Sequence, residues 1–294
     1  MDYRDILNSA SRKLLSLNGT VLDVIDIKKP ASIDYAKQLA KVISKLSPLL
    51  GNMIEFSTVD LLNKLDWDNM GIWQRQDPGF PDALFKSNLV LPNPGIEIKA
   101  WFPFATEITA RFKDSINHFN DDQINVAIIA WLPEHVIWGK PTIVDVWVGS
   151  ASSVAQARDN HYHNPPDYLV FEPEDTHDRT INLQQTNTNG FKFQGTTKEF
   201  ELASAIVKSW GNEGKKYSPS SDYQEKLNSL LGKFKYRLDT NYAKIDRIEH
   251  PGIEKFKTRV LGTHFNSLTI KSWAKILSSN DDSMLDRYLR TLLN

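Results

Sequence analysis

The 294-residue chain contains no cysteine. This absence excludes thiolate nucleophiles, Cys-ligated zinc, iron–sulfur clusters and disulfides, so chemistry here must use oxygen and nitrogen groups. Long apolar runs are lacking too, because Val126 to Leu132 is the longest and a membrane-spanning helix needs about 20 residues. Charged residues also interrupt the first 15 positions. We therefore expect a cytoplasmic protein with no export signal and no membrane span.

A strong overall charge is also absent, since the formal net charge is −1 at pH 7. The charges are unevenly placed, however: from Lys208 onward, 16 Lys and Arg stand against 10 Asp and Glu, and the rest of the chain is acidic. A basic last third suits a phosphate-bearing partner, whereas an acidic first part suits a metal ion. Two ordinary solvated surfaces of opposite sign would give the same counts.

Patterns that predict helices occur near both ends of the sequence. Hydrophobic residues make up 40% of it, which is enough for a packed core. Apolar residues at three- and four-residue spacing predict helices over Tyr3–Leu17, Asp34–Ser47 and Asn52–Leu65. The same spacing returns near the end of the chain, over Glu199–Trp210, Tyr223–Tyr236 and Ser283–Leu293.

Strand patterns dominate the centre. Ala83–Phe85 and Ile96–Trp101 flank a turn-rich stretch, which predicts a β-hairpin with a long loop. Thr106–Phe119 has an apolar stripe that predicts a crossover helix. Val126–Leu132 and Ile143–Val148 are apolar and rich in β-branched residues, as expected of buried central strands. We predict an α/β fold with a central mixed β-sheet flanked by helices.

The order of these patterns predicts one domain, because no linker is long enough to demand two. Residues 1–70 would form a helical N-terminal part, 71–195 an α/β core, and 196–294 a helical, basic C-terminal part. Within the core, a further helix is expected over Ala151–Asn160 and a further strand over Tyr168–Phe171.

Three charged residues in the hairpin carry the chemical signal. Asp82 and Glu97 are 15 positions apart, so each falls on a different strand of the predicted hairpin, where the two carboxylates can converge. Glu97 and Lys99 are two residues apart and so share one strand face, while Ile96 and Ile98 face the other way. Two converging carboxylates suit a hard cation such as Mg²⁺, and an adjacent ammonium can orient water. This combination suits phosphodiester hydrolysis.

Pro81-Asp82 followed by Glu97-Ile98-Lys99 resembles the motif of the PD-(D/E)XK nuclease superfamily. The resemblance implies a restriction-endonuclease-like core in which Asp82 and Glu97 bind Mg²⁺ and Lys99 positions or helps to activate the attacking water. It also implies a role for Glu55, whose segment looks like the helix that supplies an extra acidic residue in many restriction endonucleases. Glu55 is thus a candidate third acid of the metal site, either as a direct ligand or by supporting the ligands from behind.

The resemblance further implies a type II restriction endonuclease, which makes sequence-specific cuts in double-stranded DNA and leaves 5′-phosphate ends. The single domain of residues 1–294 would then be a nuclease domain in a bacterial or archaeal cytoplasm. A palindromic site cut on both strands is most simply served by a homodimer. A cognate DNA methyltransferase is implied as a partner in the same system, without a stable complex.

Sequence readout needs amide and guanidinium groups presented to base edges, with cations on phosphates. Such groups occur after the second strand and in two polar stretches of the core. The candidates for DNA contact are Arg111, Gln156, Arg158, Asn160, Gln184, Gln185 and Lys192. Ordinary polar surface segments would carry the same residue types.

Other interpretations stay open. Glu97 and Lys99 would also suit an exposed cross-strand pair, and Glu55 a surface position on a helix. A structure-specific or DNA-repair nuclease would use the same core. A non-catalytic DNA-binding module, or a carbohydrate-binding module using some of the 8 Trp, belongs to another class. His161 and His163 suggest zinc, although the loop after them lacks ligand spacing.

Overall fold

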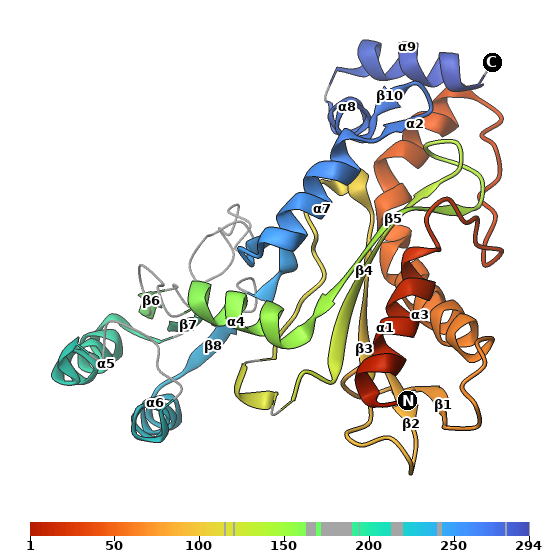
Figure 1. Cartoon of the computed structure of the whole chain (residues 1–294). Helices are drawn as coiled ribbons and strands as arrows, with labels where there is room; N and C mark the ends of the chain where they lie inside the picture. Colours follow the sequence, from red (N-terminus) through yellow and green to blue (C-terminus); the bar gives the residue numbers. More distant parts are fainter. Residues whose placement is uncertain are drawn as a thin grey trace. The chain divides into compact units, whose positions relative to one another are not determined.

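The computed structural model divides into two compact units (Figure 1). Unit 1 comprises Met1–Ala110, Phe119–Val154 and His250–Asn294, and unit 2 comprises Arg111–His118 and Ala155–Glu249. Across both units, the structure describes residues 1–114, 116–119, 121–162, 169–171, 190–193, 195–212, 220–239, 243–279 and 281–293. The unit boundaries do not coincide with the expected ones after residues 70 and 195, and the single domain over 1–294 stays a prediction.

Unit 1 is built on a five-stranded sheet with the order β1-β2-β3-β4-β5. The β3 and β4 strands are parallel, and every other neighbouring pair is antiparallel. The predicted α/β fold with a mixed central sheet flanked by helices is therefore confirmed. The strands are β1 (Ile72–Arg75), β2 (Ala83–Lys86), β3 (Gly95–Trp101), β4 (Ile124–Pro133) and β5 (Pro141–Ser150).

The predicted hairpin and central strands are also confirmed. β2 and β3 form the antiparallel pair, and their loop contains the expected Pro-rich turn. β4 is buried along its whole length except at Asn125, as its nearly continuous apolar sequence predicts. The core of unit 1 therefore lies on both faces of β4.

Helices cover both faces of the sheet near β3. A Cβ on Gly51 of α3 would lie 3.8 Å from the Cβ of Ala100, so α3 packs closely on one face. On β3 the next residue, Trp101, contacts Phe256 of α7 with ring centroids 5.9 Å apart. Because consecutive strand residues point to opposite faces, α3 and α7 lie on opposite sides of β3 (Figure 1).

The remaining helices of unit 1 match the N-terminal predictions and extend the C-terminal one. α1 begins with a capping box formed by Asp2 and Asp5, and a short 3-10 turn separates α2 from α3. α7 and α8 were not expected from the sequence. The helices are α1 (Tyr3–Leu15), α2 (Ile33–Val42), α3 (Ser47–Asn63), α7 (Pro251–Gly262), α8 (Ile270–Leu277) and α9 (Asp282–Leu293).

The crossover helix predicted over Thr106–Phe119 is wrong, because the described residues of this segment contain only a 3-10 turn, Ile116–His118. Ile108 and Phe112 are buried, so the apolar stripe does pack into a core. The Phe112 N–H, however, donates to the carbonyl of Ala243 at 2.7 Å instead of to a helical neighbour. Tertiary pairing thus overrides the helical pattern.

Unit 2 contains a three-stranded sheet with the order β6-β7-β8. Phe193 of β7 is fully buried against residues of α5 and α6, including Ala203 and Leu230. The helix and strand predicted near residues 151 and 168 are present as α4 and β6. The elements are α4 (Ala151–Tyr162), which begins in unit 1, β6 (Leu169–Phe171), β7 (Gly190–Phe193), α5 (Thr197–Ser209), α6 (Ser221–Lys233) and β8 (Tyr236–Asp239).

In the part of the chain that the structure describes, no helix is both long enough and apolar enough to cross a membrane.

The start of β3 generates a stability prediction. A Cβ on Gly95 would lie 2.3 Å from Cγ of Pro81, a contact that atoms cannot make without displacement. We expect Gly95→Ala to lower the free energy of unfolding by about 1–3 kcal/mol, measured by urea titration. Gly262→Ala is the control, because a Cβ there meets nothing within 4 Å; its effect should stay within about 0.5 kcal/mol. Equal effects of the two substitutions would contradict the close packing at Gly95.

Candidate active site

The candidate site lies where β2 stops pairing with β3. β2 pairs with β3 only at Ala83–Ile96 and Leu84–Gly95, whereas β4 pairs with β3 along its whole length. Among the described residues, the edge of β3 beyond Ile96 therefore has no strand partner on the β2 side. Such an edge exposes backbone groups that need other hydrogen-bond partners.

Asp82 supplies one of those partners. Its Oδ2 accepts a hydrogen bond from the backbone N–H of Ile98 at 2.6 Å, and its own N–H donates to Oε2 of Glu97 at 3.1 Å. The carbonyl of Asp82 accepts from the N–H of Gln76 at 2.8 Å, which ties the residue to the end of β1. Asp82 is thus tied to the backbone of β3 through Ile98 and to the end of β1 through Gln76.

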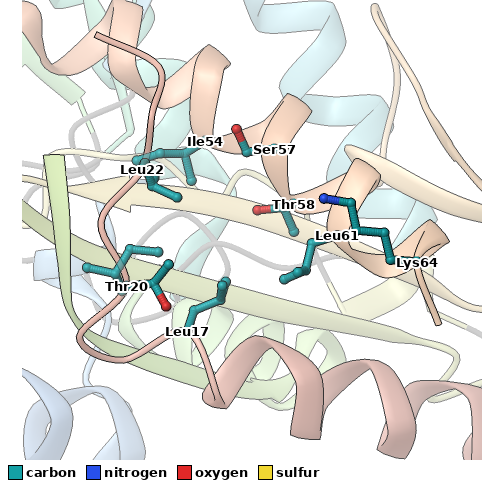
Figure 2. A pocket seen from close by; sticks show the side chains of 9 residues that line it. Leu17, Thr20, Leu22, Ile54, Ser57, Thr58, Leu61 and Lys64 are labelled. Carbon is teal, nitrogen blue, oxygen red and sulfur yellow. The ribbon is translucent and has the colours of Figure 1, made fainter. Parts of the chain in front are cut away.

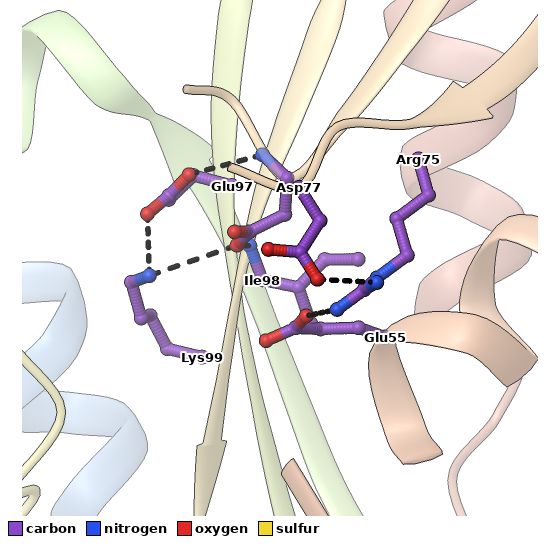
Figure 3. Close-up of polar contacts among 7 residues, drawn as sticks. Glu55, Arg75, Asp77, Glu97, Ile98 and Lys99 are labelled. Carbon is purple, nitrogen blue, oxygen red and sulfur yellow. Dashed lines mark hydrogen bonds and ion pairs between the residues drawn. The ribbon is translucent and has the colours of Figure 1, made fainter. Parts of the chain in front are cut away.

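Lys99 completes the cluster. Its Nζ forms an ion pair with Oε1 of Glu97 and lies 3.6 Å from Oδ2 of Asp82. Figure 3 shows Glu97 and Lys99 joined through this ammonium on one side of β3. The structure therefore brings Asp82, Glu97 and Lys99 together, as the two-residue spacing and the hairpin predict.

The cluster is largely removed from solvent. The exposed fractions of the side chains are 10% for Glu97, 15% for Lys99 and 17% for Asp82. Burial, together with repulsion from Asp82 and against the attraction of Lys99, raises the pKa of Glu97 to about 7. Although burial lowers the pKa of Lys99, the carboxylates of Glu97 and Asp82 raise it above the usual value for lysine. These shifts distinguish the cluster from an exposed cross-strand pair.

Glu55 lies in a neighbouring cluster. Its Oε2 is 3.3 Å from a terminal nitrogen of Arg75, whose other terminal nitrogen is 2.8 Å from Oδ2 of Asp77 (Figure 3). Burial and the charge of Asp82 raise the pKa of Glu55, and Arg75 and Lys99 oppose this shift. Glu55 is therefore within electrostatic range of the Asp82–Glu97–Lys99 cluster.

The two clusters belong to opposite faces of the sheet. Arg75, Ala83 and Ile96 are directly opposed in neighbouring strands and so share one face, whereas Glu97 and Lys99 alternate to the other. Periodicity did not identify Arg75, because β1 is only four residues long and Ile72-Trp73-Gln74-Arg75 does not alternate between apolar and polar residues.

The acids of the two clusters carry oxygen ligands of the kind that a hard divalent cation binds. Glu55, Asp77, Asp82 and Glu97 carry four carboxyl groups, and Arg75 and Lys99 carry two cations, so the fully ionised set has a formal charge of −2. Carboxylate oxygens are the ligands that Mg²⁺ prefers. Within the described residues, no group of three or more His, Asp or Glu is arranged to hold a metal by itself. A cation here would need water or substrate oxygens as further ligands.

The candidates for DNA contact that the structure describes lie in unit 2. Arg158 is buried and ion-paired with Asp159, so its guanidinium is not presented at the surface. Gln156 donates to Asn160 at 2.9 Å on the exposed side of α4. Arg111 is exposed, and its backbone forms a β-bridge with Lys244. Lys192 lies in β7, and Gln184, Gln185 and His163 fall outside the described residues.

Two other features were weighed as binding sites. Six of the 8 Trp are buried, so they fill cores and are not available as sugar-stacking platforms. A cavity of about 180 Å³ is lined by Leu17, Ile54, Leu61 and Ile143, among others (Figure 2). Its lining is mostly apolar and includes none of the clustered carboxylates.

Comparisons of the chain with protein-family models, with curated proteins and with solved structures found no match.

The raised pKa of Glu97 predicts a pH-dependent stability. The folded protein binds the proton of Glu97 more tightly than the unfolded chain does, because the pKa of Glu97 in the unfolded chain is near 4.5. In metal-free solution, the free energy of unfolding should therefore fall between pH 4.5 and about 7 relative to a Glu97→Gln variant. Urea titrations across this range measure the difference, which should stop growing above pH 8. If the free energies of unfolding of the two proteins change in parallel over the whole pH range, the pKa of Glu97 is not raised.

Proposed function

We propose that the chain is a Mg²⁺-dependent nuclease of the PD-(D/E)XK superfamily, with a restriction-endonuclease-like core in unit 1. The proposal rests on one observation, the convergence of Asp82, Glu97 and Lys99 at the open edge of β3. These are the residues of the motif, and the strand–turn–strand setting supports its relevance. The segment after β3 departs from the expected setting, because its described residues form no crossover helix.

Asp82 and Glu97 would hold the metal ion, with Glu55 assisting. Oδ1 of Asp82 accepts no hydrogen bond from the residues that the structure describes, so it keeps its lone pairs for a ligand. Each carboxylate oxygen of Glu97 accepts one hydrogen bond or ion pair and retains a second lone pair. Bound Mg²⁺ would polarise a phosphate oxygen and lower the pKa of a water ligand.

Lys99 acts as a hydrogen-bond donor and a fixed positive charge. Its raised pKa keeps the ammonium protonated at neutral pH, so in this state it does not serve as a general base. The ammonium is held between Asp82 and Glu97, where it can orient a water and balance negative charge that develops on a phosphate. Glu97 therefore has two tasks: it binds the cation and positions Lys99.

The substrate that best suits this chemistry is double-stranded DNA cut at specific sites, as in a type II restriction endonuclease with 5′-phosphate products. A homodimer would place one such site against each strand of a palindrome. A bacterial or archaeal cytoplasm and a cognate methyltransferase complete the proposed system. The exposed amides of Gln156 and Asn160 support a role for α4 in DNA contact.

Substitution of Asp82 tests the nuclease assignment. Asp82→Asn keeps the size of the side chain but removes the charge that attracts the cation. We expect Mg²⁺-dependent cleavage of plasmid DNA to fall by more than about 100-fold, while DNA binding measured in Ca²⁺ is retained.

The matched control for that test is Asp60→Asn, an exposed aspartate on α3. This variant should cleave like the wild-type protein. Undiminished cleavage by Asp82→Asn, or cleavage by the wild-type protein that continues in EDTA, would remove the assignment.

The pattern of products separates the two nuclease classes. A type II restriction endonuclease should cut a fully sequenced plasmid into discrete fragments whose ends map to one short sequence. Gel electrophoresis and end sequencing in Mg²⁺ measure this pattern. A smear, or cutting confined to junctions, nicks or mismatches, would instead assign the chain to the structure-specific or DNA-repair nucleases.

A further inference from the structure

Unit 1 contains a cavity of about 180 Å³ between the end of α1, α3 and β5 (Figure 2). Its buried wall includes Leu17, which follows α1, Ile54 of α3 and Ile143 of β5. Voids larger than a water molecule are few in a protein interior. An engineered apolar cavity of about 150 Å³ stays dry and binds benzene. The space in unit 1 is therefore large enough for a small apolar group.

The wall that faces α3 is held in place by backbone hydrogen bonds. Beyond α1, the chain runs along β5, where the Gly19 N–H donates to the carbonyl of Ile143 at 2.8 Å. The Ile143 N–H donates in turn to the carbonyl of Thr20 at 2.9 Å, and the Leu22 N–H donates to the carbonyl of Pro141 at 2.8 Å. The segment cannot move toward α3 and fill the cavity without breaking these bonds.

A buried hydroxyl group faces the cavity. Thr58 of α3 lines the space, and only 2% of this residue is exposed. Figure 2 shows its side-chain oxygen turned into the space between α3 and the segment that carries Thr20 and Leu22. Within the part of the chain that the structure describes, this hydroxyl forms no hydrogen bond. Because a buried hydroxyl without a partner disfavours folding, the arrangement suits a bound molecule that accepts its hydrogen bond.

The open side of the cavity is polar and positively charged. Thr20 and Lys64 are exposed there, and Ser57 is half-buried. Among the described residues, no acid lines the cavity and no carboxylate forms an ion pair with Lys64. Figure 2 shows the Lys64 side chain extending back along α3 toward Thr58. An ammonium and hydroxyls beside an apolar space favour a ligand that has an apolar body and an anionic head.

We propose that this cavity is a binding site for a small carboxylic acid whose apolar body is about the size of a phenyl ring. The body packs against Leu17, Ile54 and Ile143, and the carboxylate accepts hydrogen bonds from the Thr58 hydroxyl and the Lys64 ammonium. A carboxylate suits this site better than a phosphate, because Lys64 is the one cation among the described lining residues. The site is separate from the candidate active site, so the inference goes beyond the proposed function.

Methyl NMR with phenylacetate as the probe tests this proposal. The full chain, labelled at its isoleucine methyl groups, is titrated with phenylacetate. The signals of Ile54 and Ile143 should shift and saturate with a Kd of about 1 mM or below, and Ile276 of α8 should not shift because it does not line the cavity. Phenethyl alcohol, which lacks the charge, should bind about 2–5-fold more weakly. Acetate, which lacks the ring, should shift neither Ile54 nor Ile143.

Substitution of the two donors separates recognition of the carboxylate from simple partition of a ring into an apolar space. Thr58→Val should weaken phenylacetate binding by about 2–10-fold, the usual effect of losing one hydrogen bond. Lys64→Met should weaken it by about 2–5-fold, because the ammonium is exposed, and should leave the affinity for phenethyl alcohol unchanged. Lys275→Met is the matched control, since Lys275 is exposed on α8, and it should bind phenylacetate like the wild-type protein.

The proposal would be overturned if phenylacetate left the signals of Ile54 and Ile143 unchanged, or if it bound no more tightly than phenethyl alcohol. If Thr58→Val does not fold, Ser57→Phe is a second variant, because it places a ring at the half-buried side of the cavity. Ser57→Phe should abolish the shifts, and normal binding by this variant would also overturn the proposal. None of these results affects the nuclease assignment, which DNA cleavage tests separately.

Discussion

The hydrogen bond from the Ile98 N–H to the carboxylate of Asp82 is the contact on which the rest of the site depends. It forms because β2 leaves β3 after two residue pairs, so the backbone of β3 needs a partner that a neighbouring strand would otherwise supply. A side chain takes that place, and the choice of an acid brings a negative charge to the sheet edge. The alternation of β3 then puts Glu97 and Lys99 beside that charge. One local break in strand pairing thus brings Asp82, from the loop before β2, together with two residues of β3.

The charges of Asp82, Glu97 and Lys99 make this cluster a candidate metal centre. Burial and mutual repulsion act against two carboxylates held together, and Lys99 offsets only part of that cost, which is why the pKa of Glu97 is raised to about 7. A divalent cation would remove the remaining cost and return Glu97 to its ionised form. The Glu55–Arg75–Asp77 cluster extends the same charge network. Burial and the charge of Asp82 raise the pKa of Glu55 as well, although the two clusters belong to opposite faces of the sheet.

Much of this arrangement could be predicted from local patterns. A turn-rich stretch between two short apolar segments located the hairpin, period-2 alternation placed Glu97 and Lys99 on one face, and continuous apolar runs located β4 and β5. The sequence predictions failed where contacts between distant residues determine the local structure. Thr106–Phe119 has helical spacing, yet Phe112 bonds to Ala243, far along the chain. Arg158 looks like a DNA-reading residue, but its pairing with Asp159 is buried. Arg75 gave no signal because its partner Glu55 lies 20 positions earlier, and no spacing rule links a helix to a distant short strand.

The central claim is that Asp82 and Glu97 hold one divalent cation next to Lys99. Crystals of the wild-type protein grown with Mn²⁺, and measured at the manganese absorption edge, locate such a cation directly through its anomalous scattering. The account predicts an anomalous peak within coordination distance of carboxylate oxygens from both Asp82 and Glu97, about 2–2.5 Å. An ordered site without a peak, or a peak elsewhere with Asp82 and Glu97 unchanged, would contradict it.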